Sequence, residues 1–231
     1  FTPNNDTIPR FSYSKPDGET LTSYSNGTFI HDSAPITFDD QYEESILQNS
    51  EFINMDVQGD DYVFIVQKDF LFENVTIIFN ETNHHFGGIK IEGAKVTIRN
   101  CEFIGCSVNN NANAIYMTQS QTSMRLLDNT IFTDFVNDQF ALVIDFGNLR
   151  FANSSIKNSN NPTGGGLYLA TSSARFEIID SSFENLKLQG KEGDGGTAIC
   201  LTQQDSNCII QNCTFDSIEF KADDKNVSHA V

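Results

Sequence analysis

The sequence of 231 residues has no tryptophan and few basic residues. There are 14 Lys and Arg against 31 Asp and Glu, so the formal net charge is −17 at pH 7. A protein that binds nucleic acid needs a cationic surface to replace the counterions of phosphates, so this balance argues against that class. A run of about 18 apolar residues, as a membrane-spanning helix requires, is also missing. We therefore expect neither a nucleic-acid partner nor a membrane span in this chain.

Cysteine is scarce, and its number of five is odd. Any disulfide scheme therefore leaves at least one thiol unpaired or joined to another chain. Within one repeat, Cys101 could pair with Cys106 or Cys200 with Cys213, and the sequence does not choose between them. Cys208 occupies an apolar position and reads as a buried thiol.

The start of the chain and its glycosylation signals both point to secretion. The sequence begins with Phe1, without a signal-like apolar segment after it, so we expect a processed piece of a longer precursor. Seven Asn-x-Ser/Thr sequons favour passage through a secretory pathway. They predict an extracellular or cell-surface glycoprotein. The sequon asparagines are Asn5, Asn26, Asn74, Asn80, Asn153, Asn212 and Asn226.

A short apolar triplet (apolar, any residue, apolar) recurs about every 26 residues. Its first members are spaced 26, 27, 25 and 32 residues apart. Self-similarity at such a period is typical of a solenoid, in which each repeat buries its apolar face only by stacking on its neighbours. The triplets begin at Ile89, Ile115, Leu142, Leu167 and Ile199.

A second pattern keeps step with the first. An Asn or Asp stands three residues before a large apolar residue and two residues after another apolar residue. Period-two alternation in stretches such as Val96-Thr97-Ile98 predicts strands rather than helices. The instances are Leu47/Asn49/Phe52, Ile98/Asn100/Phe103, Leu127/Asn129/Phe132, Phe151/Asn153/Ile156, Ile178/Asp180/Phe183 and Ile210/Asn212/Phe215.

Together the two patterns predict an all-β, right-handed parallel β-helix of about six to seven coils over residues 45–220. Successive coils would stack at roughly 4.8 Å, with the apolar residues of each triplet and the phenylalanines inside. An irregular N-terminal arm or cap is expected over residues 1–44 and a polar tail over residues 221–231. Lys90, Tyr116, Val143, Tyr168 and Cys200 are expected to face outward.

We expect the Asn column to point inward at a bend, where each amide could bond to the backbone and to the next turn. The alternative is that Asn marks solvent-exposed turns. A buried amide cannot carry a glycan, so the inward reading makes Asn153 and Asn212 poorer glycosylation sites than Asn5, Asn26, Asn80 and Asn226.

The glycine-led triplets carry a family resemblance over about residues 45 to 220. The segments Gly87-Gly88-Ile89, Gly165-Gly166-Leu167-Tyr168 and Gly195-Gly196-Thr197-Ala198-Ile199 resemble those of right-handed parallel β-helix proteins of the pectin-lyase-like superfold. In repeat style they are similar to polymorphic outer-membrane-protein-like surface proteins. Those proteins alternate this element with Phe-x-x-Asn, whereas Asn-x-x-Phe takes its place here. The resemblance implies the fold rather than a function.

Catalytic and metal-binding patterns are weak, so we expect no enzyme, no metal and no cofactor. The acid pairs lie outside the most regular turns, and none has a matching Asp one coil further on, so we interpret them as solvated loop acids. The adjacent His84 and His85 would point opposite ways on a strand and are better explained by a turn. The acid pairs are Asp39-Asp40, Glu43-Glu44, Asp60-Asp61 and Asp223-Asp224.

Four arginines recur at nearly the coil period, at Arg99, Arg125, Arg150 and Arg175. On a stacked solenoid they could form a stripe that grips an acidic glycan or an acidic neighbour. Alternatively, nearby Glu102, Asp128 and Glu177 pair with them and keep the wall soluble, which is the interpretation that we favour.

The sequence therefore predicts a non-enzymatic, secreted and N-glycosylated β-solenoid. It would act as a structural or surface protein, for example as a subunit of an extracellular filament that assembles end to end. Its partners would be further copies, other surface glycoproteins or glycans. The alternative is an adhesin-type domain that binds glycans or proteins, with Tyr116, Tyr168 and the arginine column in contact with the ligand. A polysaccharide lyase or hydrolase is the third option.

Overall fold

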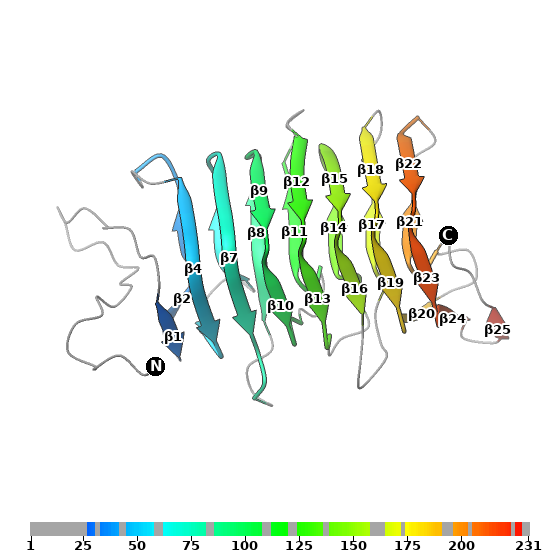
Figure 1. Cartoon of the computed structure of the whole chain (residues 1–231), viewed down its shortest axis with the longest axis horizontal. Helices are drawn as coiled ribbons and strands as arrows, with labels where there is room; N and C mark the ends of the chain where they lie inside the picture. The colour runs from blue at the N-terminus through cyan, green and yellow to red at the C-terminus, as the bar shows by residue number, and fades with distance from the viewer. Residues whose placement is uncertain are drawn as a thin grey trace.

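The computed structural model describes residues 27–30, 33–41, 45–57, 62–81, 86–107, 112–119, 124–135, 139–157, 165–171, 174–190, 196–202, 205–222 and 225–227. All regular secondary structure in these ranges is β, from β1 to β25, and the strands stack side by side along one axis (Figure 1). Every strand pairing is parallel except that of β24 with β25. The expectation of an all-β parallel solenoid is confirmed.

One wall of the solenoid is a seven-stranded sheet that contains the predicted apolar triplets. Its strands, listed from the N-terminal end, are β3 (Ile36–Phe38), β6 (Tyr62–Val66), β8 (Gly87–Glu92), β11 (Ile115–Thr118), β14 (Leu142–Ile144), β17 (Leu167–Leu169) and β21 (Ile199–Leu201).

The other two walls belong to one thirteen-stranded sheet that is folded along a corner. The second wall holds β9 (Val96–Arg99), β12 (Met124–Asp128), β15 (Asn148–Ala152), β18 (Arg175–Ile179) and β22 (Asn207–Gln211). The third holds β1 (Thr28–Ile30), β10 (Glu102–Ile104), β13 (Ile131–Thr133), β16 (Ser155–Lys157), β19 (Ser182–Glu184) and β23 (Thr214–Asp216). The longer strands β4 (Ile46–Ile53) and β7 (Phe70–Ile78) cross the corner and belong to both walls.

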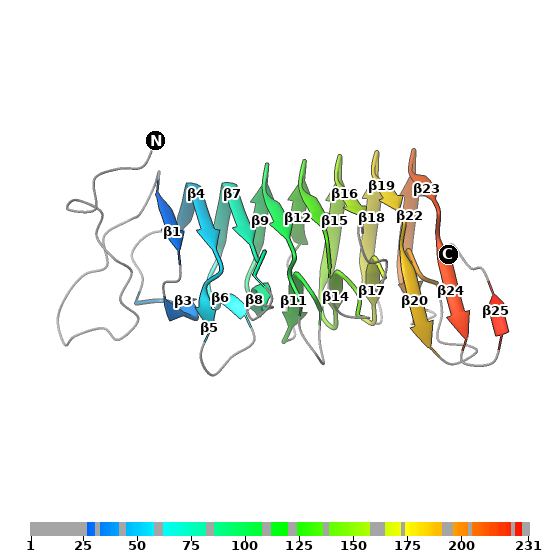
Figure 2. The same cartoon turned by 90° about the horizontal axis from the view of Figure 1, so that it is seen from below.

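Two small sheets complete the described structure. β2 (Ser33–Ala34) pairs with β5 (Asp56–Val57), and β20 (Lys187–Gly190) pairs with β24 (Glu219–Ala222), on which β25 (Lys225–Val227) folds back. Figure 2 shows β20, β24 and β25 at the C-terminal end of the rod.

About five turns share one strand order, from β8–β10 to β21–β23, slightly fewer than the six to seven coils expected. Two further levels, β3–β4 and β6–β7, precede them, and in each a single long strand replaces two short ones.

The predicted domain boundaries need correction at both ends. β1 and β3 already pair with the coils, so the solenoid begins before residue 45, and β24 and β25 form strands in the expected polar tail. The first strands were not predicted because their segment contains scattered aromatics and does not show the repeat pattern. Residues 1–26 lie outside the described part.

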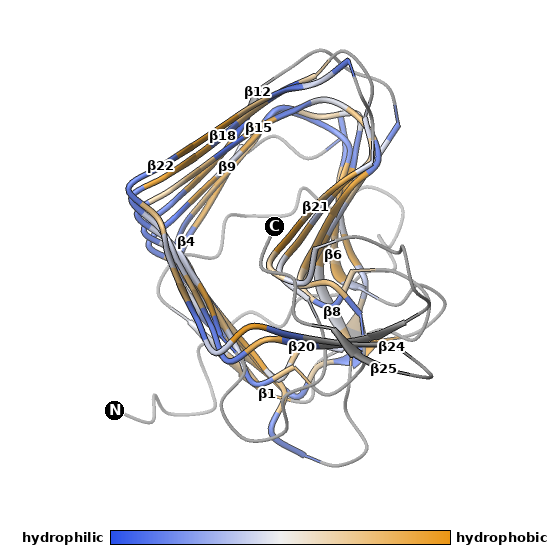
Figure 3. Cartoon of the chain, turned by 90° about the vertical axis from the view of Figure 1, so that its right-hand side faces the viewer, coloured by the Kyte–Doolittle hydropathy of each residue, from blue (hydrophilic) through white to orange (hydrophobic). Residues whose placement is uncertain are grey.

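The core consists of the columns that the repeats predicted. The triplet residues at Ile89, Ile115, Leu142 and Leu167 are in register and fully buried. The phenylalanines of the third wall stack from coil to coil: ring centroids lie 4.9 Å apart for Phe103 and Phe132, and 5.2 Å for Phe183 and Phe215. Viewed along the axis, the three walls enclose this interior (Figure 3).

The corner between the second and third walls corrects our prediction for the Asn column. The column points outward, and its members are exposed. Each has a positive φ of 47–53°, a left-handed conformation that Asn and Asp tolerate better than other residues with a side chain. A residue in this conformation between two strands turns its side chain away from the interior. The corner residues are Asn49, Asn74, Asn100, Asn129, Asn153, Asp180 and Asn212.

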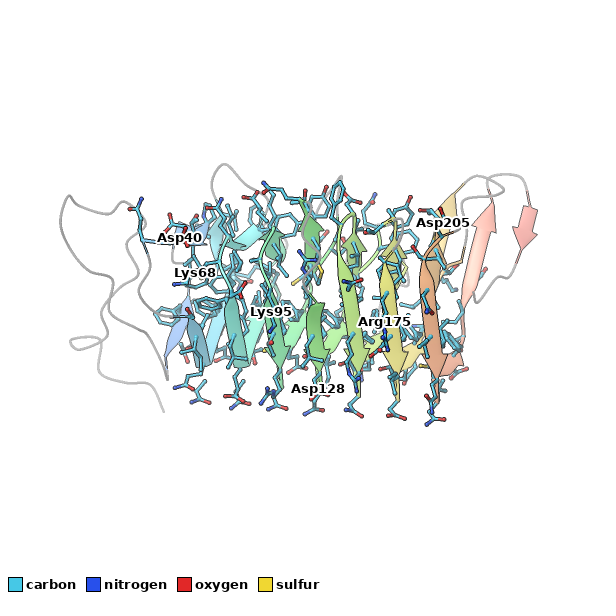
Figure 4. All side chains as sticks on the ribbon, turned by 90° about the horizontal axis from the view of Figure 1, so that it is seen from above. Asp40, Lys68, Lys95, Asp128, Arg175 and Asp205 are labelled. Atoms are coloured by element: carbon cyan, nitrogen blue, oxygen red, sulfur yellow. The ribbon has the colours of Figure 1, made fainter. Side chains whose placement is uncertain are left out.

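The corner side chains nevertheless bond between coils, outside the core. The Nδ2 atom of Asn74 donates to Oδ1 of Asn49 at 2.9 Å, and Asn129 donates to Asn100 in the same way at 2.7 Å. Asn153 donates to Asp128 instead, at 2.8 Å. Figure 4 shows Asp128 at this edge, where side chains project from successive coils. The prediction of contacts between turns therefore holds for an outward column.

The inward polar column is the next residue along the chain. Thr130, Ser154 and Ser181 are buried, and each hydroxyl donates to the carbonyl oxygen two residues before it at 2.6–3.1 Å. The amide N–H groups of Thr130 and Ser154 donate in turn to the hydroxyl of the following coil. These bonds satisfy backbone groups that the corner removes from the sheet pattern.

All five cysteines are free thiols, three of them buried. Neither pairing that the sequence allowed within a repeat is present. Cys101 takes the place of the inward Ser or Thr at its corner, and its Sγ lies 3.2 Å from the carbonyl oxygen of Arg99. Cys208, expected to be buried, lies in an inner column but is only partly covered because its coil is the last of the solenoid.

Candidate functional site

The C-terminal end of the solenoid is open. Leu201 and Ile210 belong to inner columns, yet they are 41% and 38% exposed, whereas Leu169 and Ile178 at the same positions one coil earlier are fully buried. Phe215 and Cys208 are also only partly covered. Figure 3 looks onto this end. The interior of the last coil therefore meets solvent.

The backbone at this end is open as well. Among the described strands, β21, β22 and β23 each pair on one side only, with β17, β18 and β19. β22 has the sequence Asn-Cys-Ile-Ile-Gln, without a charge or a proline. Edge strands of soluble proteins usually carry a charged residue or a proline, because a flat apolar edge invites pairing with another chain. Hence β22 is an edge suited to strand addition.

The N-terminal end differs. Phe29, Ile36 and Phe38 lie in the inner columns of the first strands β1 and β3, and they are only 3%, 2% and 0% exposed. The two ends of the rod are therefore not equivalent: residues of the inner columns are exposed at the C-terminal end and buried at the N-terminal end.

The outer face of the first wall carries two tyrosines. Tyr116, Val143 and Tyr168 occupy one outward column on consecutive coils, as expected, and all three are half-buried. Cys200 continues this column on the next coil but is buried, which corrects the expectation that it faces solvent. The Tyr116 hydroxyl donates to Oδ2 of Asp145 at 2.7 Å. Burial and the neighbouring Asp145 carboxylate both raise the pKa of Tyr116. Phe140 packs against Tyr168 at a centroid distance of 5.3 Å, so this face presents fixed aromatic rings.

The predicted stripe of four arginines does not form, because Arg125 lies inside. It is fully buried, in an inner column between Val96 and Leu149, and donates from Nε to the Ala94 carbonyl at 3.0 Å and from Nη1 to the Phe146 carbonyl at 3.2 Å. Burial lowers the pKa of its guanidinium. Alternation contains the signal that spacing missed: Arg125 stands two residues before the inward Leu127 and so faces the same way.

The other three arginines face outward and pair with acids. Arg99 Nη1 lies 3.6 Å from Glu73 Oε1, and Arg150 Nη1 lies 3.0 Å from Glu177 Oε2. Arg175, which Figure 4 labels on β18, pairs with the same Glu177. Of the acids named from the sequence, Glu177 takes the predicted role, while Glu73 rather than Glu102 or Asp128 pairs with Arg99. Whether any of these arginines binds a ligand stays a prediction.

In the described ranges, no group of three or more His, Cys, Asp and Glu is arranged to hold a metal ion. Asp39 and Asp40 are described, whereas His84, His85 and the other acid pairs fall outside the described residues. Burial raises the pKa of Cys101 to about 11 and that of Cys106 further, so both thiols stay protonated at neutral pH. The described part also contains no helix long and apolar enough to span a membrane.

Three of the seven sequons coincide with the outward corner: Asn74, Asn153 and Asn212. There the left-handed turn favours Asn, and the residue two positions later faces outward on the third wall, where Ser and Thr are common. Corner geometry thus accounts for these sequons without a glycan. Asn153 and Asn212 are exposed, which corrects our expectation that burial would disfavour them.

Of the remaining four sequons, those at Asn80 and Asn226 lie away from this corner. Asn80 is exposed, and its Oδ1 accepts a hydrogen bond from Asn54 Nδ2 at 2.7 Å. Asn226 lies in β25, and Asn5 and Asn26 fall outside the described residues.

Comparison with known proteins agrees with this architecture. No curated protein matches the chain significantly. The family model described as "Right handed beta helix region" matches residues 25–222, a range that includes every coil from β1 to β24. The chain therefore belongs to the right-handed beta helix family.

Proposed function

We propose that this protein is a non-enzymatic structural element of an extracellular or cell-surface assembly, joined to further copies end to end. The observation that carries the proposal is the open C-terminal end, with its exposed inner columns and its uncharged edge strand β22. A parallel coil of a second copy would continue the sheets of the first. A head-to-tail contact of this kind propagates into a filament unless its rotation closes a ring.

Secretion and N-glycosylation are part of the same proposal. The support comes from the seven sequons in the chain, two of which, at Asn80 and Asn226, lie away from the corner between the second and third walls. The test is the intact mass of protein purified from its natural source, before and after removal of N-glycans. A mass equal to that of the bare chain would overturn this part.

The assembly is tested by placing a charge on the open edge. In Ile210→Lys, a lysine on β22 would oppose strand addition. Ser182→Lys, on the outer face one coil earlier, is the matched control. We expect the wild type and the control to form concentration-dependent oligomers in sedimentation velocity and rods in electron micrographs, and Ile210→Lys to stay monomeric. A wild type that is monomeric at every concentration, or an Ile210→Lys variant that assembles normally, would contradict the proposal.

The tyrosine face of the first wall supports a second candidate, an adhesin-type glycan-binding surface. Tyr116 and Tyr168 lie two coils apart in one column, about 10 Å at the usual strand spacing. Aromatic rings held at such a spacing can stack on sugar rings of one chain. A glycan array should then give hits that Tyr168→Ala loses, and an array without hits would count against this candidate. Incubation with acidic polysaccharides, with and without calcium, tests the proposed lack of enzymatic activity.

A further inference from the structure

The outer face of the third wall changes character along the rod. Its N-terminal half, from β1 to β13, has ten outward positions, occupied by five Ile, three Thr and two Glu. The same positions on β16, β19 and β23 are Ser155, Lys157, Ser182, Glu184, Thr214 and Asp216. Both halves share one backbone geometry, so the sheet itself does not demand isoleucine in the first half.

The isoleucines form a continuous line that we call the isoleucine stripe: Ile30, Ile53, Ile78 and Ile104. They are direct neighbours on β1, β4, β7 and β10. Each of the four follows an inward residue of the core and therefore faces outward. Ile30 is 55% exposed, and the other three are half-buried. A contiguous apolar line on the outside of a folded wall marks an interaction surface more often than scattered apolar residues do.

A second column runs beside the stripe and supplies its charge. Glu51, Thr76 and Glu102 are neighbours on β4, β7 and β10, so the two carboxylates lie about 10 Å apart at ordinary strand spacing. Among the described residues, neither Glu51 nor Glu102 forms an ion pair, whereas Glu73 and Glu177 on the second wall do. None of the ten outward positions in this half of the face is basic.

We propose that this face, the isoleucine stripe with Glu51 and Glu102, docks a basic amphipathic helix of a partner protein. The complementary charge comes from the acidic column, which a second copy of this acidic chain would repel. The geometry agrees: residues i and i+7 of a helix are about 10.5 Å apart, close to the separation of the two carboxylates. A helix along the rod axis would thus pair two cations with Glu51 and Glu102 and lay its apolar side on the stripe.

The probe is a fluorescently labelled synthetic helix with a leucine face and lysines at i and i+7, measured by fluorescence anisotropy with the whole chain. Its counterpart has glutamate in place of lysine. Ile78→Ser/Ile104→Ser removes the centre of the stripe, and Glu51→Gln/Glu102→Gln removes the charges. The matched control, Ser182→Ala/Glu184→Gln, lies on the polar half of the same face. All these side chains point outward, so circular dichroism and thermal unfolding should show that each variant folds.

We expect the lysine helix to bind and the glutamate helix not to bind. The serine variant should bind at least about tenfold more weakly, because apolar anchors at the centre of a contact dominate affinity. The glutamine variant should lose affinity together with much of its salt dependence. The control should bind like the wild type.

Three results would overturn the proposal. In the first, the lysine helix does not bind. In the second, the control variant binds the lysine helix as weakly as the stripe variants do, which indicates attraction to an acidic chain in general. In the third, the wild type self-associates through the stripe, shown by sedimentation that Ile78→Ser/Ile104→Ser abolishes, and the occupant is then a second copy.

Discussion

Replacement of Gly166 by alanine tests how closely the coils approach one another at the start of the first wall. A Cβ atom at this position would lie 2.2 Å from the Ala198 carbonyl oxygen and 3.0 Å from a ring carbon of Phe183. The position recurs in each coil as a small residue: Gly88, Ala114 and Ala141 precede Gly166 in register. Close stacking here leaves no room for a side chain on the Gly166 level.

The cost follows from this geometry. The coils that contain Gly166 and Ala198 would need to move apart by about 1 Å, because the added carbon and the carbonyl oxygen come no closer than roughly 3.2 Å without repulsion. That shift would stretch the hydrogen bonds from Gly166 N to Thr197 O and from Leu167 N to Ala198 O, both 2.9 Å. Overpacking costs about 1–3 kcal/mol and a lost hydrogen bond about 1 kcal/mol, against a gain of about 0.5 kcal/mol from the stiffer unfolded chain. The repulsion wins, and we expect Gly166→Ala to lose about 2–3 kcal/mol.

Urea unfolding followed by far-UV circular dichroism measures the loss. Ala141→Gly, at the same position one coil earlier, is the matched control, because it adds no atom and should lose only about 0.5–1 kcal/mol through backbone entropy. The reasoning is refuted if Gly166→Ala unfolds at the same urea concentration as the wild type or at a higher one, since the coils then have room that the structure denies.

Three further perturbations address the core, the corner and a buried thiol. Phe132→Ala removes a fully buried ring 4.9 Å from that of Phe103 and should cost about 3–5 kcal/mol in urea unfolding; a loss below about 1 kcal/mol would contradict the stack. At the left-handed corner, Asn129→Ala should cost about 1 kcal/mol more than Asn129→Gly, and equal stabilities would argue against the positive φ. Burial raises the pKa of Cys101 to about 11, above the ordinary value near 8.5, so the folded state holds this proton more tightly than the unfolded state. Its contribution is complete below about pH 8.5 and falls as pH rises toward 11; Cys101→Ser should flatten that decline in urea midpoints, and an unchanged slope would refute the assignment.

The repeats predicted the walls and the inner columns well because strand alternation fixes which residues share a face. Ile89 and Phe103 could be placed inside from their spacing alone. The direction of the Asn column could not be read in this way, because a left-handed residue interrupts the alternation. An inward side chain and an outward one then show the same sequence pattern.

Other predictions failed because they used the spacing between coils but not the alternation along each strand, which decides the face that a side chain occupies. The arginines recur at nearly the coil period, but Arg125 faces the interior from β12, whereas Arg150 faces outward from β15. The same alternation contains the isoleucine stripe: Ile53, Ile78 and Ile104 each follow an inward residue and must face outward.

The corner between the second and third walls also determines where the chain can change in length. Two residues connect the strands there in each of the regular turns, from β9–β10 to β22–β23, whereas the connections that lead into the first wall vary in length. The 24 to 32 residues between successive corner positions therefore differ only away from that corner. Peptide insertions between β13 and β14 should leave the register of every wall unchanged, whereas one added residue at the corner would reverse the faces of the following strand. For protein engineering, this fold is a scaffold that can display inserted peptides along one side of a rod.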